Sequence, residues 1–196
     1  CLPLQASADL SNITNKPTAI LDGLTWNLSV IDNQLLAGRD DGLWRVTNYQ
    51  ASPVSQSAGY WTCKSLTQTE PLQMAAGNYF GIRLFEKNNG NFIDKGGIGK
   101  FTESSRYIET DNDNIWVSHP YRGVYKINIS SKAVTLFNQK NGLPADLDNH
   151  VFKIRNKIVF ATTKGIYEFN QAGNNMIISK DYIDLFSEKP IRYLKE

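Results

Sequence analysis

Short segments that place aromatic rings beside cationic or polar side chains are the part of this sequence best suited to binding chemistry. The most unusual is His119-Pro120-Tyr121-Arg122. An aromatic ring stacks on the apolar face of a sugar, and guanidinium, ammonium and imidazole groups bind hydroxyl groups through directed hydrogen bonds. We therefore predict a site for a small-molecule or oligosaccharide ligand. Its candidate residues are Arg39, Asp40, Tyr79, His119, Tyr121, Arg122 and Lys164.

The same loop has a simpler interpretation, in which Tyr121 packs against the fold and Arg122 is only solvated.

The candidate residues lie in short connections that are expected to share one face of the molecule. The reason is that consecutive antiparallel strands put alternate loops on opposite faces. Ligands often occupy such loop-rich faces, although this is an analogy between folds. Sequence alone leaves the two interpretations open.

Catalytic chemistry has little support. The histidines are His119 and His150, and neither lies in a metal-binding or catalytic motif. Ser118 precedes His119, and neighbouring side chains of a strand point to opposite faces, so these two cannot act as a nucleophile and base. The acidic run at 111–114 lacks the glycine and distal glutamate of a calcium loop and is predicted to be a turn. We predict no catalytic residue, no cofactor and no metal site.

The bulk composition excludes several other classes. With 21 Lys and Arg against 19 Asp and Glu, the net charge of +2 is too balanced for a nucleic-acid footprint. No run of about 20 apolar residues is present to span a membrane. The sequence starts at Cys1, so we expect a processed or excised chain, with a lipid-modified cysteine as an alternative. Cys1 and Cys63 are expected to be independent thiols, and a disulfide between them stays open.

A repeat organises the chain. Glycines at positions 42, 81, 123 and 165 are separated by 39, 42 and 42 residues, and four positions around each are apolar in every copy. Counted from the glycine, the positions at −7, −6, +1 and +4 hold Leu35, Leu36, Leu43 and Val46; Met74, Ala75, Ile82 and Phe85; Trp116, Val117, Val124 and Ile127; and Ile158, Val159, Ile166 and Phe169. In a chain that is 41% hydrophobic, sixteen apolar residues at sixteen positions indicate a true repeat.

Short strands repeating about every 42 residues predict an all-β fold, a β-propeller fragment of about four blades with part of a fifth. Each blade is expected to be a four-stranded antiparallel sheet, with the glycines in tight turns that require positive φ. The predicted units are 1–21, a remnant of a preceding blade or a loose terminus; 22–66, blade 1; 67–105, blade 2; 106–147, blade 3; 148–182, blade 4; and 183–196, the start of a further blade.

Three expectations concern individual elements. The segment 60–66 is expected to be an outer strand of blade 1, following an Ala/Ser/Pro-rich turn, and 191–194 the inner strand of a further blade. No helical periodicity is evident. The side chains of Trp26, Trp44 and Trp116 are expected in the core, because they fall on strand positions.

Three motifs carry a family resemblance. Ile115-Trp116-Val117, Gly123-Val124-Tyr125-Lys126-Ile127 and Asn141-Gly142-Leu143-Pro144 resemble the repeat of the two-component regulator propeller family. The resemblance covers residues 22–196. Blade 2 departs from the pattern, because it has no aromatic residue after Gly81-Ile82 of the kind the family shows and no Gly-Leu-Pro ahead of it.

In that family, such propellers form the extracytoplasmic sensors of bacterial transmembrane regulators, often for glycan fragments. The resemblance implies a periplasmic, ligand-binding sensor portion without catalysis, whose histidine kinase or DNA-binding output domain lies outside this segment. Its implied partners are the ligand and the remaining blades of the same receptor, with a homodimer as a second form of association, and neither nucleic acid nor membrane contacts this segment.

Two alternatives stay open. A protein-interaction scaffold would show a large exposed apolar patch without a pocket. A glycan-active enzyme would show two carboxylates about 5–10 Å apart at the propeller axis.

Overall fold

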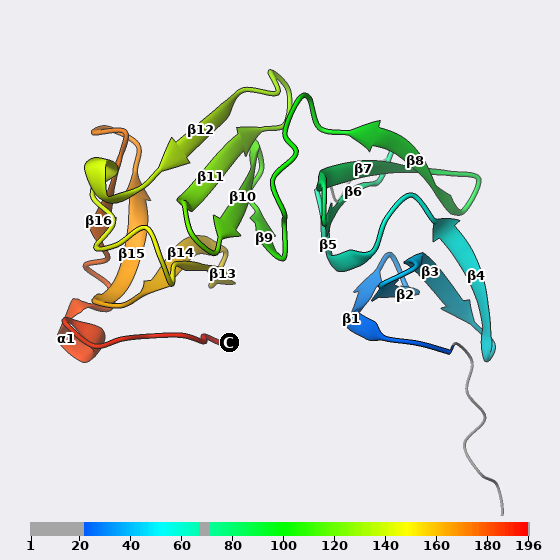
Figure 1. The fold of residues 1–196 in the computed structure, drawn as a ribbon, viewed down its shortest axis with the longest axis horizontal. Helices are drawn as coiled ribbons and strands as arrows, with labels where there is room; N and C mark the ends of the chain where they lie inside the picture. Colours follow the sequence, from blue (N-terminus) through cyan, green and yellow to red (C-terminus); the bar gives the residue numbers. More distant parts are fainter. Residues whose placement is uncertain (1–21, 67–70, 196) are drawn as a thin grey trace, which may run out of the picture.

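The computed structural model describes residues 22–66 and 71–195, which form four antiparallel sheets of four consecutive strands each (Figure 1). Blade 1 contains β1 (Thr25–Ile31), β2 (Gln34–Arg39), β3 (Gly42–Thr47) and β4 (Gln50–Ser55). Blade 2 contains β5 (Tyr60–Ser65), β6 (Gln73–Asn78), β7 (Gly81–Asn88) and β8 (Asn91–Gly97). Blade 3 contains β9 (Tyr107–Thr110), β10 (Asn114–His119), β11 (Gly123–Asn128) and β12 (Val134–Phe137). Blade 4 contains β13 (His150–Ile154), β14 (Lys157–Thr162), β15 (Gly165–Asn170) and β16 (Asn175–Ile178).

The sheets fan around a common centre. Figure 1 shows the first strands β1, β5, β9 and β13 on the inside of the arc and the fourth strands β4, β8, β12 and β16 at its periphery. Consecutive first strands contact one another around the centre. The predicted fold class, an all-β propeller arc of four-stranded blades, is confirmed. Two short helices accompany it in the described residues, the 3₁₀-helix η2 (Gln139–Asn141) and the single-turn α1 (Ile183–Phe186), which the sequence analysis did not predict.

The repeated glycines are explained by backbone geometry. Gly81 and Gly123 have φ of 126° and 102°, in the region that side chains with a Cβ rarely adopt. A Cβ on Gly123 would also lie 2.2 Å from the carbonyl oxygen of Phe137, because the outer strand and its exit cross directly over this position. Each such glycine therefore allows the third strand to start against the segment that follows the fourth strand.

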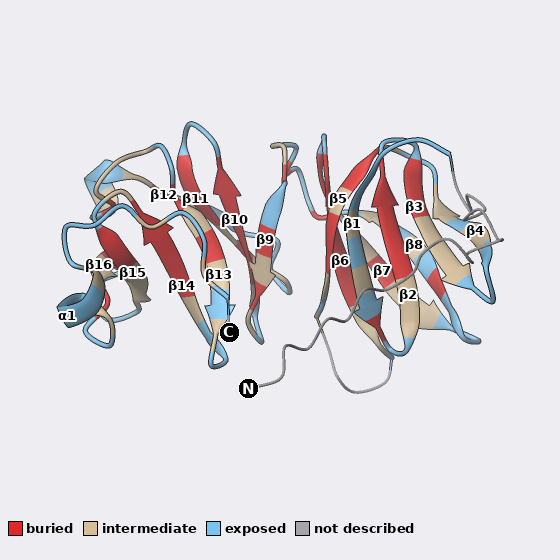
Figure 2. Ribbon diagram, turned by 90° about the horizontal axis from the view of Figure 1, so that it is seen from below, coloured by how far each residue is buried: buried red, intermediate tan, exposed pale blue. Residues whose placement is uncertain are grey.

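The core lies between the blades rather than within any one of them. Leu36 and Leu43 of blade 1 pack against Met74 and Phe85 of blade 2. Further clusters join blades 2 and 3 and blades 3 and 4 in the same way. Figure 2 shows this as buried central strands in each sheet, flanked by exposed loops at both rims. A single sheet has two apolar faces, so each blade depends on its neighbours for burial.

The outer strand of blade 1 was predicted wrongly. The strand at 60–65, expected to be outer, is β5, the innermost strand of blade 2, and it pairs with β6. The true outer strand is β4, which was interpreted as a turn because it is rich in Ser and Ala and contains Pro53. Proline is tolerated there because the outermost strand has one free edge. The second sheet therefore begins at Tyr60, within the range 22–66 assigned to blade 1.

The repeat alignment needs a shift of one residue in blade 3. His119 pairs with Gly123 across a three-residue loop, whereas β6 and β7 are joined by a two-residue loop. The structural equivalent of Met74 is consequently Ile115 and not Trp116. Ile115 packs toward blade 2, and Trp116 packs toward blade 4. Both residues are apolar, so the count of apolar columns concealed the shift.

The segment after β16 covers the far side of blade 4. Val159 and Ile166 point away from blade 3 and are nevertheless buried. Helix α1 contacts β15, and the ring of Tyr193 packs edge-on against Phe152 at 5.7 Å. The N–H of Ile191 donates to the carbonyl of Thr162 at 2.9 Å, as the N–H of Ser105 does to Asn78 at the entry to blade 3.

Residues 183–195 therefore take the position of an entry into a further blade. They contain α1 but no strand within the described residues, so the start of a further blade at 183–196 stays a prediction. Residues 1–21, predicted to be a remnant of a preceding blade or a loose terminus, lie outside the described residues.

Within residues 22–66 and 71–195, no segment covers the apolar face at the opposite end of the arc. Leu28 and Val30, two positions apart in β1, lie on the same face of the strand, away from blade 2. Their side chains are 63% and 71% exposed. The half-buried Leu35 pairs with Val30 across the strands and continues this face. The expectation that Trp26 lies in the core is wrong, because it is 43% exposed. Trp44 is half-buried, and Trp116 is buried as predicted.

We predict that Trp116→Ala lowers the free energy of unfolding by about 3–5 kcal/mol, as in other large-to-small core changes. Its ring contacts Phe137, Phe160 and Phe169, and its indole N–H donates to Asp111 at 2.7 Å. Urea titration measures the loss. The control Trp26→Ala should cost about 1 kcal/mol or less, as a surface change does. A loss below 1 kcal/mol for Trp116→Ala would contradict its core role.

We also predict that the chain self-associates through the uncovered face of β1, because exposed apolar patches and strand edges promote association. Light scattering should give a mass above that of the monomer. Leu28→Asp with Val30→Asp should return the chain toward the monomer, whereas the control pair Thr135→Asp with Gln171→Asp adds the same charge at exposed polar positions and should not. A strict monomer for the unmodified chain would refute this.

Candidate functional site

In each blade, the second strand ends on a buried polar residue whose side chain contacts the following loop. These residues are Arg39, Asn78, His119 and Thr162. Asn78 Oδ1 accepts the N–H of Phe80 at 2.8 Å, and Thr162 Oγ1 accepts the N–H of Lys164 at 3.2 Å. His119 Nδ1 accepts the N–H of Tyr121 at 3.2 Å. The repeated i to i+2 contact gives this position a structural role in the turn, which explains two of the predicted site residues.

The surroundings of His119 favour its neutral form. Burial lowers the pKa of His119, Glu103 opposes this, and Arg122 lowers the pKa further. Since Nδ1 accepts a hydrogen bond, the proton lies on Nε2, which is 3.4 Å from Glu103. Arg122 Nη1 also pairs with Glu103 at 2.6 Å, while Tyr121 is 75% exposed at the loop tip. This loop thus holds one exposed ring beside an internally paired guanidinium.

The other predicted residues are distributed over separate blades. Arg39 is buried, with Nε paired to Asp41 at 2.9 Å and Nη2 bonded to the carbonyl of Asp22. Asp40 is exposed at the tip of its loop. In blade 4, Lys164 Nζ lies 3.7 Å from Glu188 Oε2 of the C-terminal segment. The structure therefore brings together His119, Tyr121 and Arg122, and keeps Arg39 and Lys164 apart from them.

Tyr79 links this rim to the centre of the arc. Its ring packs on Trp61 with 4.2 Å between centroids. Trp61 lines a cavity of about 500 Å³ at the propeller axis. The first strands of all four blades and the C-terminal segment form its wall, which consists of Trp26, Asn27, Trp61, Thr62, Lys64, Arg106, Tyr107, Ile108, Glu109, Val151, Phe152, Lys153, Ile154, Arg192, Tyr193, Leu194 and Lys195.

Two of the aromatic residues in the axial cavity owe their placement to strand irregularities. The register between β1 and β2 shifts between Thr25 and Asn27, so Trp26 is the extra residue. The register between β5 and β6 shifts in the same way between Tyr60 and Thr62, at Trp61. A β-bulge re-aims one side chain, and bulges are common next to functional sites. Both tryptophans are thereby turned out of the alternating pattern, and both line the cavity.

The charged groups of the cavity are held in defined positions. Lys64 pairs with Glu109 at 2.6 Å, and Lys153 Nζ donates to the carbonyl of Thr110 at 3.1 Å. The guanidinium of Arg106 lies 5.5 Å from the ring centre of Tyr107. Glu109 is the one carboxylate of the lining residues, so the described wall does not supply the carboxylate pair that a glycosidase needs.

Sequence reasoning missed this site, and none of the seven predicted residues lines it. The available signal was an aromatic residue close to the start of the first strand, as in Trp26, Trp61 and Tyr107. It went unnoticed because the repeat was anchored on the third strand. In addition, a bulge cannot be read from an alternating pattern.

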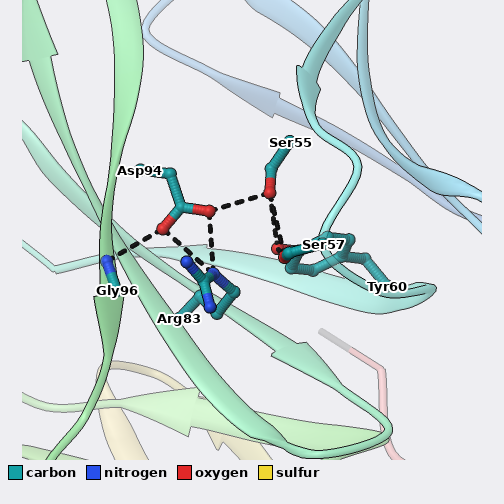
Figure 3. Close-up of polar contacts among 6 residues, drawn as sticks. All are labelled: Ser55, Ser57, Tyr60, Arg83, Asp94 and Gly96. Carbon is teal, nitrogen blue, oxygen red and sulfur yellow. Dashed lines mark hydrogen bonds and ion pairs between the residues drawn. The ribbon is translucent and has the colours of Figure 1, made fainter.

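A second polar cluster joins blades 1 and 2 at the outer side (Figure 3). Arg83 Nε donates to both carboxylate oxygens of Asp94, at 3.0 Å to Oδ1 and 2.7 Å to Oδ2. Ser55 Oγ donates to Asp94 Oδ2 at 2.8 Å. The buried Tyr60 hydroxyl contacts Ser55 at 2.9 Å and Ser57 at 2.8 Å. All members have partners inside the cluster, so its role is to fasten the connection between β4 and β5.

No group of three or more His, Cys, Asp or Glu that could hold a metal ion occurs in residues 22–66 and 71–195. In the same residues, no helix has the length and apolar character needed to cross a membrane. Cys63 is a free, buried thiol, and burial raises its pKa to about 12. Cys1 lies outside the described residues.

Comparison with solved structures shows that this chain shares the fold of known β-propellers. The extracellular domain of the putative hybrid two-component system BT4673 from B. thetaiotaomicron has a TM-score of 0.63 and 15% identity over 79% of this chain and 21% of its own. The corresponding domain of BT3049 from the same organism has a TM-score of 0.60 and 15% identity over 88% and 25%. The WD40 propeller domain of Doa1 has a TM-score of 0.51 and 14% identity over 78% and 53%.

The fold that the repeat motifs implied is thus confirmed. The chain spans about a fifth to a quarter of the length of the two sensor-domain structures. No protein-family model and no curated protein matches this sequence.

We predict that Asp94 makes the stability of the chain acid-sensitive. Burial alone would raise the pKa of Asp94, but hydrogen bonds from Arg83, Gly96 and Ser55 and the charge of Arg83 together lower it below its usual value. A lowered folded-state pKa gives stability that is present above the unfolded-state pKa, about 3.9, and lost as the pH falls through the folded-state pKa.

Urea titration at pH values from about 6 to 3 tests this expectation. The unmodified chain should be more stable than Asp94→Asn at pH 6, and this difference should shrink on acidification. Ser57→Ala is the control, because it removes a hydroxyl that contacts Tyr60 and leaves the Asp94 carboxylate in place. A difference that stays constant over this pH range would contradict the ionised Asp94.

Proposed function

We propose that this chain is the ligand-binding portion of an extracytoplasmic sensor propeller of a bacterial transmembrane regulator, and that it binds an oligosaccharide in the axial cavity. The observation that carries the proposal is the pair of bulges that turn Trp26 and Trp61 into this cavity. The fold similarity to extracellular domains of two-component systems supports the sensor role and the periplasmic location.

The chemistry of the wall supports a sugar as the ligand. Tyr107, Phe152 and Tyr193 join the two tryptophans, so rings from all four blades and the C-terminal segment face one space. Rings bind the apolar C–H face of a pyranose, and the amide and charged groups between them bind its hydroxyl groups. A cavity of about 500 Å³ lies within the range of small-molecule sites.

The rim residues stay as a second set of proposed contacts. Tyr79 is continuous with the cavity through Trp61, and Tyr121 and Arg122 supply an exposed ring and a cation on the β10–β11 loop. The apolar face of β1 is proposed to be covered by another blade of the same receptor, in the way that blade 2 covers the other side. A homodimer through this face is the alternative that the self-association experiment detects.

We predict that Trp26→Ala weakens oligosaccharide binding about tenfold, the equivalent of one ring stacking interaction of about 1.4 kcal/mol. Calorimetry with a panel of neutral and acidic oligosaccharides, with the thermal midpoint as the folding control, measures this. The double change Tyr121→Ala with Arg122→Ala should have a smaller effect. If it abolishes binding while Trp26→Ala does not, the ligand lies on the rim. If no member of the panel binds, the proposed function is wrong.

A further inference from the structure

The charges of the axial cavity are strongly one-sided. Its wall carries five cations, Lys64, Arg106, Lys153, Arg192 and Lys195, against the single carboxylate of Glu109. Removing these six residues from the chain's 21 basic and 19 acidic residues leaves 16 basic and 18 acidic ones, a net charge of −2. The positive charge of this nearly balanced protein is therefore concentrated at the propeller axis.

Within the described residues, ion pairs neutralise only a small part of this charge. Glu109 pairs with Lys64 at 2.6 Å, which leaves four cations. In the described part of the chain, no carboxylate forms an ion pair with Arg106, Lys153, Arg192 or Lys195. Like charges repel, so four cations around one concave space raise the energy of the empty site and favour an anionic occupant.

Two of these cations are arranged to bind rather than to be solvated freely. The Arg106 guanidinium lies over the ring of Tyr107, so its planar fork is held by stacking while its N–H groups stay available. Lys153 uses one of its three donors on the carbonyl of Thr110, which fixes the ammonium group and leaves two donors. Arg192 comes from the C-terminal segment on the same wall.

We propose that the ligand of the axial cavity is an anionic oligosaccharide, whose carboxylate or sulfate groups bind Arg106, Lys153, Arg192 and Lys195 while its sugar rings stack on Trp26 and Trp61. This inference rests on the proposed function and narrows its ligand class. Arginine forms bidentate hydrogen bonds with carboxylate and sulfate oxygens, and such charge-assisted bonds are stronger than those to neutral hydroxyl groups. Neutral sugars would leave these cations without a counter-charge.

The decisive comparison uses two ligands of one shape on the chain of 196 residues. Calorimetry with tetragalacturonate and with its full methyl ester should give at least tenfold tighter binding of the acid. Raising the NaCl concentration should weaken binding of the acid and leave the ester unchanged. A chondroitin sulfate tetrasaccharide against its nonsulfated counterpart then distinguishes sulfate from carboxylate as the preferred group. This arm needs no variant and therefore no assumption about folding.

Variants then locate the anion. Arg106→Gln with Arg192→Gln should reduce the advantage of the acid over the ester, because it removes two of the four cations proposed to bind the anion and keeps a hydrogen-bonding amide at each position. The control Lys140→Gln with Lys180→Gln removes two exposed cations outside the cavity wall, and it should keep the advantage. Circular dichroism reports whether each variant is folded.

The outcomes separate the two proposals. Equal binding of acid and ester overturns the anionic class and leaves oligosaccharide binding intact, whereas no binding of any sugar overturns both. A single-stranded DNA oligonucleotide that binds as tightly as the acid, with the same loss in Arg106→Gln with Arg192→Gln, would also overturn the assignment to sugars. Cations set between aromatic rings suit stacked bases as well.

Discussion

The packing of one sheet face against the next is the interaction on which the rest of this structure depends. A four-stranded sheet with apolar residues on both faces cannot bury them alone, and here the facing sides of consecutive blades cover one another. Met74 packs back toward blade 1 while the adjacent Ala75 packs forward toward blade 3. This alternation fixes the radial arrangement, and the arrangement in turn brings four first strands to one axis. The wall of the axial cavity is therefore a product of the core, because no single blade supplies all of it.

Much of this fold was predictable because the interblade core repeats. The glycine column and the apolar columns together identified the period, the strands that follow each glycine and the four blades of the described residues. The errors occurred where a residue's role depends on its neighbours in space. Pro53 suggested a turn, although an outermost strand tolerates it. The loop at Pro120-Tyr121-Arg122 is one residue longer than its equivalents, so Trp116 was aligned with Met74 although it faces the other way.

The candidate site was harder to predict than the fold for a physical reason. His119 has the residue type of a functional group, yet its ring nitrogen caps a turn, as Asn78 and Thr162 do in their blades with chemically different side chains. Only the shared contact makes them equivalent, and no residue pattern shows it. Conversely, Trp26 has the residue type of a core side chain. The bulge beside it reverses that expectation, since one extra residue exchanges the two faces of a strand.

An axial site has a consequence for signalling that a rim site on one blade would lack. Its wall combines β1, β5, β9 and β13 with the C-terminal segment, so a ligand that filled the cavity would contact every blade of the arc at once. Ligand binding shifts a conformational equilibrium only by its difference in affinity between two arrangements. A ligand held by Trp26 at one end of the arc and Arg192 at the other has contacts that change whenever the blades move relative to one another. If the ligand is the proposed anion, the four cations of the cavity would make this difference larger, because the anion would remove a repulsion that favours separation of the same strands.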